Sequence, residues 1–150
     1  MGNKTTAKTI ENKEELIKAV KYIATETSKL AKKIIGKNFP IKSLTVFAHS
    51  QSEYELLTGI LSEMGKPHNY NNGPRVELSE PIKVRSNYIA YLRIRTPDVE
   101  RPQVGCNDFE VDYDDFKKLY LDKYKNKLIF IKRLIVKNYQ SFYNLAYNVN

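Results

Sequence analysis

Residues 88–111 read YIAYLRIRTPDVERPQVGCNDFEV, and this segment decides the fold that the sequence predicts. It begins with a strand pattern over residues 88–95, rich in aromatic and aliphatic side chains. A proline-rich connection follows, and residues 105–111 form a second strand pattern that leads into a helix. The segment therefore predicts a junction between two sheet-forming halves of the chain.

Four charged residues of this segment stand at alternate positions. Side chains two residues apart in a strand project from the same face, so Arg93 and Arg95 share one face of their strand. Asp108 and Glu110 share a face of the second strand for the same reason. These charges predict a functional site. The alternative is that the arginines pair with the carboxylates across neighbouring strands, because a buried charge needs a partner.

The composition is that of an ordinary globular protein. The 150 residues suit one domain, and 41% hydrophobic and 28% charged residues exclude a disordered chain. No apolar run approaches the roughly 20 residues that span a bilayer, so we expect no membrane insertion. The N-terminus has no signal-peptide pattern, and we expect a cytoplasmic protein. The single cysteine, Cys106, excludes an intrachain disulfide and a cysteine-cluster metal site.

The formal net charge of +8 has two interpretations. It favours a polyanionic partner, such as nucleic acid. It is also typical of a lysine-rich chain whose helices carry solvated cationic faces.

The first half of the chain predicts a leading helix and one set of strands. We expect a flexible start over residues 1–10 and a single domain over residues 11–150. Apolar residues at helical spacing predict a helix over residues 12–36, with lysines on the opposite face. Further elements are predicted in the order strand (41–49), helix (51–64) and short strands (68–70, 75–78, 82–84 and 88–95).

The second half repeats this order of elements. A strand over residues 105–111 precedes a helix over residues 112–124, and strands are predicted over 127–133, 134–139 and 142–149. The predicted fold class is therefore α+β. It comprises a leading helix (11–40) and two tandem βαβββ modules (41–97 and 103–150).

Two tandem βαβββ modules resemble the architecture of the vicinal oxygen chelate superfamily, which includes glyoxalases and ring-cleaving dioxygenases. Within it, the chain is similar to the YecM-like family of predicted metal-binding proteins over most of residues 12–149. The similarity rests on the leading helix, the strand that ends in Ala48 and His49, NNGPRVELSEPIKV (71–84) and residues 88–111. It implies two curved sheets that form a cup.

In that superfamily a divalent metal lies in the cup, held by His or Glu from the first and last strands of each module. Open coordination positions then bind two vicinal oxygens of a substrate. On this chain the first-strand positions fall near Ser43 and on Asp108, and the last-strand position falls at residues 145–147. The resemblance thus implies Asp108 as a metal ligand, whereas the other positions lack the usual His or Glu.

The predicted cup combines cations, carboxylates and an imidazole. Arginine binds carboxylates and phosphates bidentately, so the candidate ligand-binding residues are Tyr91, Arg93 and Arg95. Imidazoles and carboxylates move protons or bind metals, so the candidate catalytic residues are Asp108, Glu110 and His49.

Two functional hypotheses follow. The first is a protein that binds a small anionic ligand in the cup, with a divergent metal-dependent enzyme as its catalytic version. The alternative is a non-enzymatic basic module whose N-terminal helix and 123–137 surface contact nucleic acid or an acidic protein. Two modules complete a cup within one chain, so a monomer is expected, with a homodimer as the other possibility.

Overall fold

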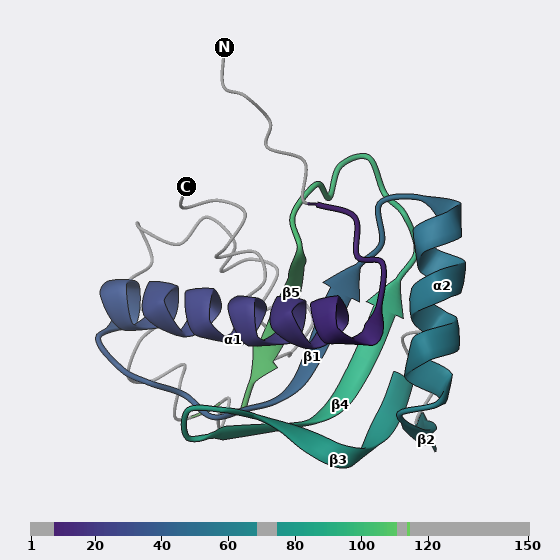
Figure 1. Cartoon of the computed structure of the whole chain (residues 1–150). Coiled ribbons are helices and arrows are strands. Elements are labelled where there is room, and N and C mark those ends of the chain that lie inside the picture. Colours follow the sequence, from purple (N-terminus) through teal and green to yellow (C-terminus); the bar gives the residue numbers. More distant parts are fainter. Residues whose placement is uncertain (1–7, 69–74, 111–113, 115–150) are drawn as a thin grey trace.

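A computed structural model describes residues 8–68, 75–110 and 114. In this part of the chain two helices pack on one face of a five-stranded mixed sheet, which confirms the α+β class (Figure 1). The predicted helix over 112–124 and the predicted strands over 127–149 lie outside the described residues. Neither described helix is long and apolar enough to cross a membrane.

The leading helix, α1 (Lys13–Ile35), begins and ends with local signals that the sequence carries. The Asn12 side chain accepts a hydrogen bond from the Glu15 backbone N–H at 2.9 Å, which satisfies one unpaired donor of the first turn. Gly36 ends the helix in the left-handed conformation (φ 83°), which favours glycine because it has no Cβ. The predicted helix is confirmed.

The second helix, α2 (Gln51–Ser62), follows directly after the first strand, β1 (Ile41–Phe47). Ser50 caps it, because its hydroxyl accepts the Glu53 backbone N–H at 3.1 Å. Leu57 and Leu61 lie one turn apart and are buried against the sheet.

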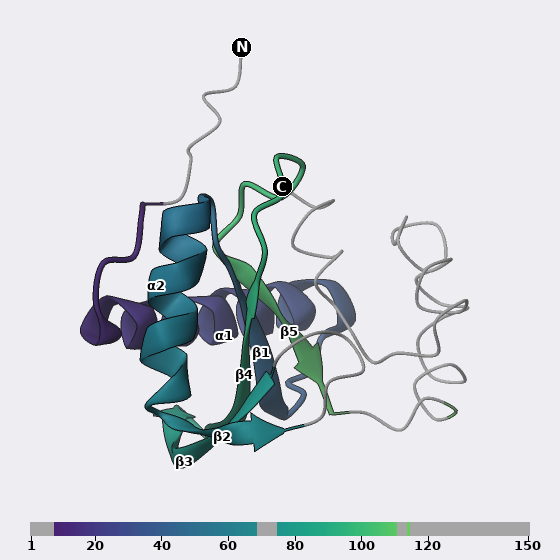
Figure 2. The same cartoon turned by 90° about the vertical axis from the view of Figure 1, so that its right-hand side faces the viewer.

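The sheet has the strand order β2-β3-β4-β1-β5. β1 pairs with β4 in parallel, and the other neighbouring pairs are antiparallel, so β1 separates β4 from β5 (Figure 2). The remaining strands are β2 (Gly65–His68), β3 (Arg75–Val84), β4 (Asn87–Arg95) and β5 (Gly105–Phe109).

Two strand predictions need correction. The sequence predicts separate strands at 75–78 and 82–84, but β3 is continuous, with a register shift in its pairing between Glu77 and Ile82. Pro81 lies within that shift and has no N–H to donate, so the pairing with β4 is interrupted although the strand continues. β2 also begins earlier than expected, because Gly65 and Pro67 belong to an edge strand instead of a turn.

The core lies between the helices and one face of the sheet. Leu44 on β1 pairs with Leu92 on β4, and both are almost fully buried. Leu16 and Val20 of α1 and Leu57 of α2 belong to the same apolar cluster. Asn107 of β5 hydrogen-bonds to Thr27 of α1, which ties the edge strand to the helix. Residues at the intervening strand positions therefore project from the opposite face of the sheet.

The turn between β3 and β4 contains a strained residue. Arg85 has a φ of 56° and is the only non-glycine residue with positive φ among those described. It occupies the first central position of a two-residue hairpin loop, where glycine is favoured when φ is positive. A side chain in this conformation costs on the order of 1 kcal/mol.

Candidate functional site

The face of the sheet opposite the helices gathers charged and aromatic side chains, and we call it the second face. The strand registers assign its members by alternation from the core residues Leu44 and Leu92. The members are Ser43, Thr45, Phe47, Lys66, His68, Arg75, Glu77, Tyr91, Arg93, Arg95, Cys106 and Asp108.

Three arginines form the cationic centre of the second face. Arg93 pairs with Thr45 of β1 and Arg95 with Phe47, so the two side chains share one face as the sequence predicts. Val76 pairs with Leu92 in the antiparallel β3–β4 ladder, so the preceding residue of β3, Arg75, stands beside Arg93. The sheet thus adds a third guanidinium from a neighbouring strand to the predicted pair.

The pKa of Arg93 is affected by its burial and by the two neighbouring arginines. Burial lowers the pKa of the Arg93 guanidinium below its ordinary value, and the charges of Arg95 and Arg75 act in the same direction. Cys106 and Asp108 oppose the lowering of this pKa. Because an arginine stays protonated in proteins, the outcome is a half-buried positive charge close to two others. An anion bound nearby would relieve their repulsion.

The Tyr91 ring contacts one residue from each of the strands β3 and β2, Arg75 and His68. The guanidinium carbon of Arg75 lies 4.7 Å from the Tyr91 ring centroid, a cation–π contact, and the His68 ring centroid lies 4.6 Å from it. Within the described structure, Arg75 Nε and His68 Nδ1 are buried and have no hydrogen-bond partner. Buried polar atoms normally have partners, so these two atoms leave unused hydrogen-bonding capacity beside Tyr91.

The second face is cationic overall among the described residues. Its full positive charges are Lys66, Arg75, Arg93 and Arg95, and its carboxylates are Glu77 and Asp108. Lys66 Nζ lies 3.8 Å from Glu77 Oε2, so one carboxylate is matched by a lysine at the sheet edge. Among the described members of the second face, three arginines and one carboxylate, Asp108, remain besides this pair.

Asp108 lies across β1 from the arginines. It pairs with Ser43, and its neighbour on the second face is Cys106. Since β1 separates β4 from β5, the alternative in which arginines and carboxylates stand on adjacent strands is wrong. Asp108 nevertheless acts on the Arg93 pKa, so the two charges interact over the intervening strand.

The described surroundings of Asp108 do not fit a divalent metal. Residues 8–68, 75–110 and 114 contain no group of three or more His, Cys, Asp or Glu side chains arranged to hold a metal ion. The Arg93 charge interacts with Asp108 and repels a cation, and the Cys106 thiol stays protonated. The metal-ligand role of Asp108 stays a prediction that requires ligands from outside the described residues.

Cys106 should be chemically inert in the native protein. Burial raises the pKa of its thiol to about 12, and the Asp108 charge acts in the same direction. We expect iodoacetamide at pH 8 to modify native Cys106 at least about 100-fold more slowly than the urea-unfolded chain, because the thiolate is the nucleophile. Mass spectrometry measures both rates, and equal rates would contradict the burial.

The raised pKa of Cys106 also makes the stability of the native protein depend on pH. Between pH 9 and about 12 the thiol loses its proton in the unfolded chain but keeps it in the native protein, so the free energy of unfolding should fall as pH rises through this range.

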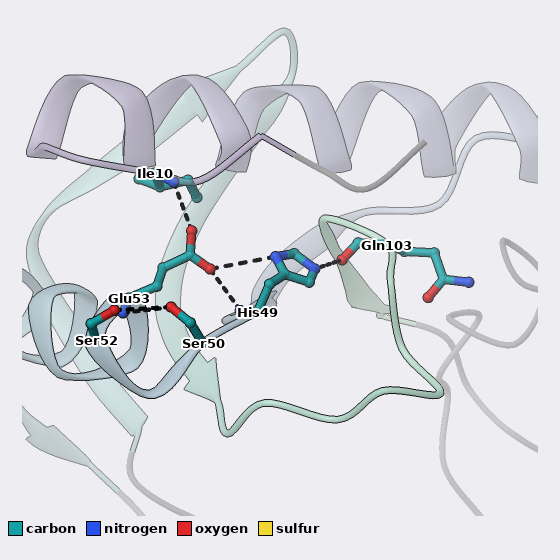
Figure 3. A network of polar contacts seen from close by, with 6 residues as sticks. All are labelled: Ile10, His49, Ser50, Ser52, Glu53 and Gln103. Carbon is teal, nitrogen blue, oxygen red and sulfur yellow. Dashed lines mark hydrogen bonds and ion pairs between the residues drawn. The ribbon is translucent and has the colours of Figure 1, made fainter. Parts of the chain in front are cut away.

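His49 lies elsewhere, just after β1 and before α2 (Figure 3). Its Nε2 lies 2.8 Å from the Gln103 carbonyl oxygen, which only accepts, so Nε2 carries the proton and donates. Its Nδ1 lies 3.4 Å from Glu53 Oε1 without forming a hydrogen bond. The imidazole is therefore engaged between α2 and the loop over residues 96–104.

Glu53 is the centre of this network, and sequence reasoning missed it. Its buried carboxylate accepts the backbone N–H groups of Ile10 and His49, each at 2.7 Å (Figure 3). The carboxylate thus joins the segment before α1 to the start of α2, which is far from it in sequence. The pattern Ser50-x-x-Glu53, a capping-box signature, was the available signal.

The three candidate catalytic residues do not meet. Asp108 pairs with Ser43, which precedes His49 by six residues, a distance of roughly 20 Å along β1 at about 3.3 Å per residue. Glu110 follows β5, is exposed, and donates its backbone N–H to the Pro40 carbonyl oxygen at 2.8 Å. By contrast, the candidate ligand-binding residues Tyr91, Arg93 and Arg95 lie together on β4.

Comparisons with protein-family models, with curated proteins and with solved structures find no match for this chain.

Proposed function

We propose that the chain binds a small anionic ligand on the second face, with Arg75, Arg93 and Arg95 as the binding residues. The observation that carries this proposal is that the three arginines share one face of β3 and β4, where the charges of Arg75 and Arg95 act on Arg93. A planar guanidinium matches the oxygens of a carboxylate or phosphate group with two parallel hydrogen bonds. Partial burial strengthens such bonds relative to those at an exposed surface.

Tyr91 and His68 belong to the same proposed site. Contact with the Tyr91 ring restricts the long Arg75 side chain, which reduces the conformational entropy that anion binding would cost. The unpartnered Nδ1 of His68 and Nε of Arg75 supply further polar contacts beside it. Thr45 pairs with Arg93 but is not needed in the site, because its side chain hydrogen-bonds to Cys106.

The proposal includes the tandem arrangement of modules. β1, α2, β2, β3 and β4 follow the order of one βαβββ module, and β5 is the first strand of the second module in this interpretation. A second module over residues 103–150 would turn the second face into the inner wall of a cup. A cup would exclude water from the arginines and so favour a small ligand over a macromolecule.

A catalytic version would use Asp108, Glu110 and His49, and it stays a prediction. The separation of His49 from Asp108 means that these residues act on one small substrate only after rearrangement. The basic-module alternative, in which nucleic acid or an acidic protein binds the lysine-rich surface, makes a different prediction. Affinity for such a polyanion would fall steeply with salt.

A thermal-shift screen of the full chain against small carboxylates and phosphate esters tests the proposal. At least one anion should raise the melting temperature in a concentration-dependent way, since it binds the native state. Arg93→Ala should lower the affinity for that anion at least about 10-fold, which corresponds to about 1.4 kcal/mol of binding free energy. Arg93→Lys should recover only part of the affinity, because lysine keeps the charge but loses the bidentate geometry.

Lys83→Ala is the matched control, since it removes an exposed cation of β3 and should leave affinity unchanged. Circular dichroism establishes that each variant is folded. If Arg75→Ala, Arg93→Ala and Arg95→Ala all bind every hit as the native chain does, the arginine site is refuted.

A further inference from the structure

A hollow that is separate from the arginine site lies between the C-terminal half of α1 and the β3–β4 turn. It has a volume of about 90 Å³, room for several waters. It is lined by cations and hydrogen-bonding groups and by no acidic side chain. Those that the argument uses are Thr25, Ser28, Lys29, Lys32, Asn38 and Arg85.

We infer that this hollow binds a phosphate group. A tetrahedral phosphate has five heavy atoms and suits a space of this size. Its oxygens accept hydrogen bonds from hydroxyl, amide, ammonium and guanidinium groups, which are the groups that line the walls. The inference is independent of the arginine site, which lies on the opposite face of the sheet from α1.

The lining side chains are available for a ligand. The Thr27 hydroxyl donates a hydrogen bond to the Ile23 carbonyl oxygen in the preceding helical turn, at 2.7 Å. In the described part of the chain, the hydroxyl groups of Thr25 and Ser28 make no such bond. Lys29 Nζ pairs with Glu26 at 3.2 Å, but both side chains are exposed, and such pairs exchange readily with solvent or ligand. A phosphate would therefore displace little existing structure.

Arg85 gives this hollow its most specific feature. The turn position requires a positive φ, for which glycine is favoured, yet it holds an arginine. Lys32 has a structural explanation, because a cation in the last turn of α1 stabilises the helix dipole. Neither turn geometry nor the helix dipole explains Arg85. A guanidinium held at the rim of a cationic hollow does explain it, since strained residues cluster at binding sites.

The test is an NMR titration of the ¹⁵N-labelled full chain with inorganic phosphate. We expect saturable shifts at the backbone amides of Ser28, Asn38 and Asn87, which line the hollow. Arg85→Gly should weaken this binding at least about 10-fold, while the melting temperature stays equal or rises because glycine suits the turn. The variant thus separates loss of binding from loss of folding.

Lys13→Ala is the control, since it removes an equivalent charge from α1 roughly 20 Å along the helix from Ser28, at about 1.5 Å per residue. A parallel titration with a short single-stranded oligonucleotide identifies the source of the phosphate. Much tighter, strongly salt-dependent binding that Arg85→Gly weakens would point to a nucleic-acid backbone. If Arg85→Gly binds both probes as the native chain does, the inference is overturned. Phosphate binding that only Arg93→Ala removes would overturn it too, and would leave the proposed function standing.

Discussion

Replacing Glu53 with alanine should lower the free energy of unfolding by about 3–5 kcal/mol. The carboxylate is almost fully buried and accepts two backbone N–H groups, those of Ile10 and His49. Each donor left unsatisfied costs about 1–3 kcal/mol. The His49 ring also loses its neighbouring carboxylate. Urea unfolding of the full chain, followed by circular dichroism, measures the change.

Two further variants make this result specific. Glu53→Gln keeps one acceptor oxygen but turns an NH₂ group towards a donor, so about half of the loss should remain. Glu55→Ala removes an exposed carboxylate from the same helix and should change stability by less than about 0.5 kcal/mol. A Glu53→Ala variant as stable as Glu55→Ala would contradict the role of the network.

The helices were predictable because their end signals are local. Asn12, Ser50 and Gly36 act on backbone groups within four residues, so the sequence beside each helix contains all the information needed. The interior of the sheet was harder to predict. Pro81 is an ordinary turn signal, and only the pairing with β4 makes it part of a continuous strand with a register shift.

The candidate site also has a part that the sequence predicts and a part that only the tertiary structure shows. The shared face of Arg93 and Arg95 follows from the two-residue period of a strand, which no tertiary contact alters. Arg75 joins them only through the register of the β3–β4 hairpin, which the sequence does not specify at that distance from the turn. The partner of His49 is a backbone carbonyl at Gln103, and any residue type supplies a carbonyl, so no sequence pattern marks it.

Replacing Gly105 with alanine should cost about 3 kcal/mol, near the upper end of the usual range for overpacking. Gly105 pairs with Val46 at the start of β5, close to α1. A Cβ there would overlap the Thr45 carbonyl oxygen and lie 2.5 Å from Ile23 Cδ1. The carbonyl belongs to β1, a strand paired on both sides, so it cannot move away as a flexible side chain would. Urea unfolding measures the loss.

Gly59→Ala is the matched control, because a Cβ at Gly59 meets nothing within 4 Å and alanine favours a helix by up to about 1 kcal/mol. The two glycine variants should therefore change stability in opposite directions. Since overpacking at Gly105 has to displace β5, it should also expose the buried Cys106 thiol and speed its alkylation. A Gly105→Ala protein with native stability and a protected thiol would mean that β5 does not pack against β1 and α1 as described. The position of Asp108 relative to Arg93 would then need to be determined anew, since the same strand carries Asp108 on the second face.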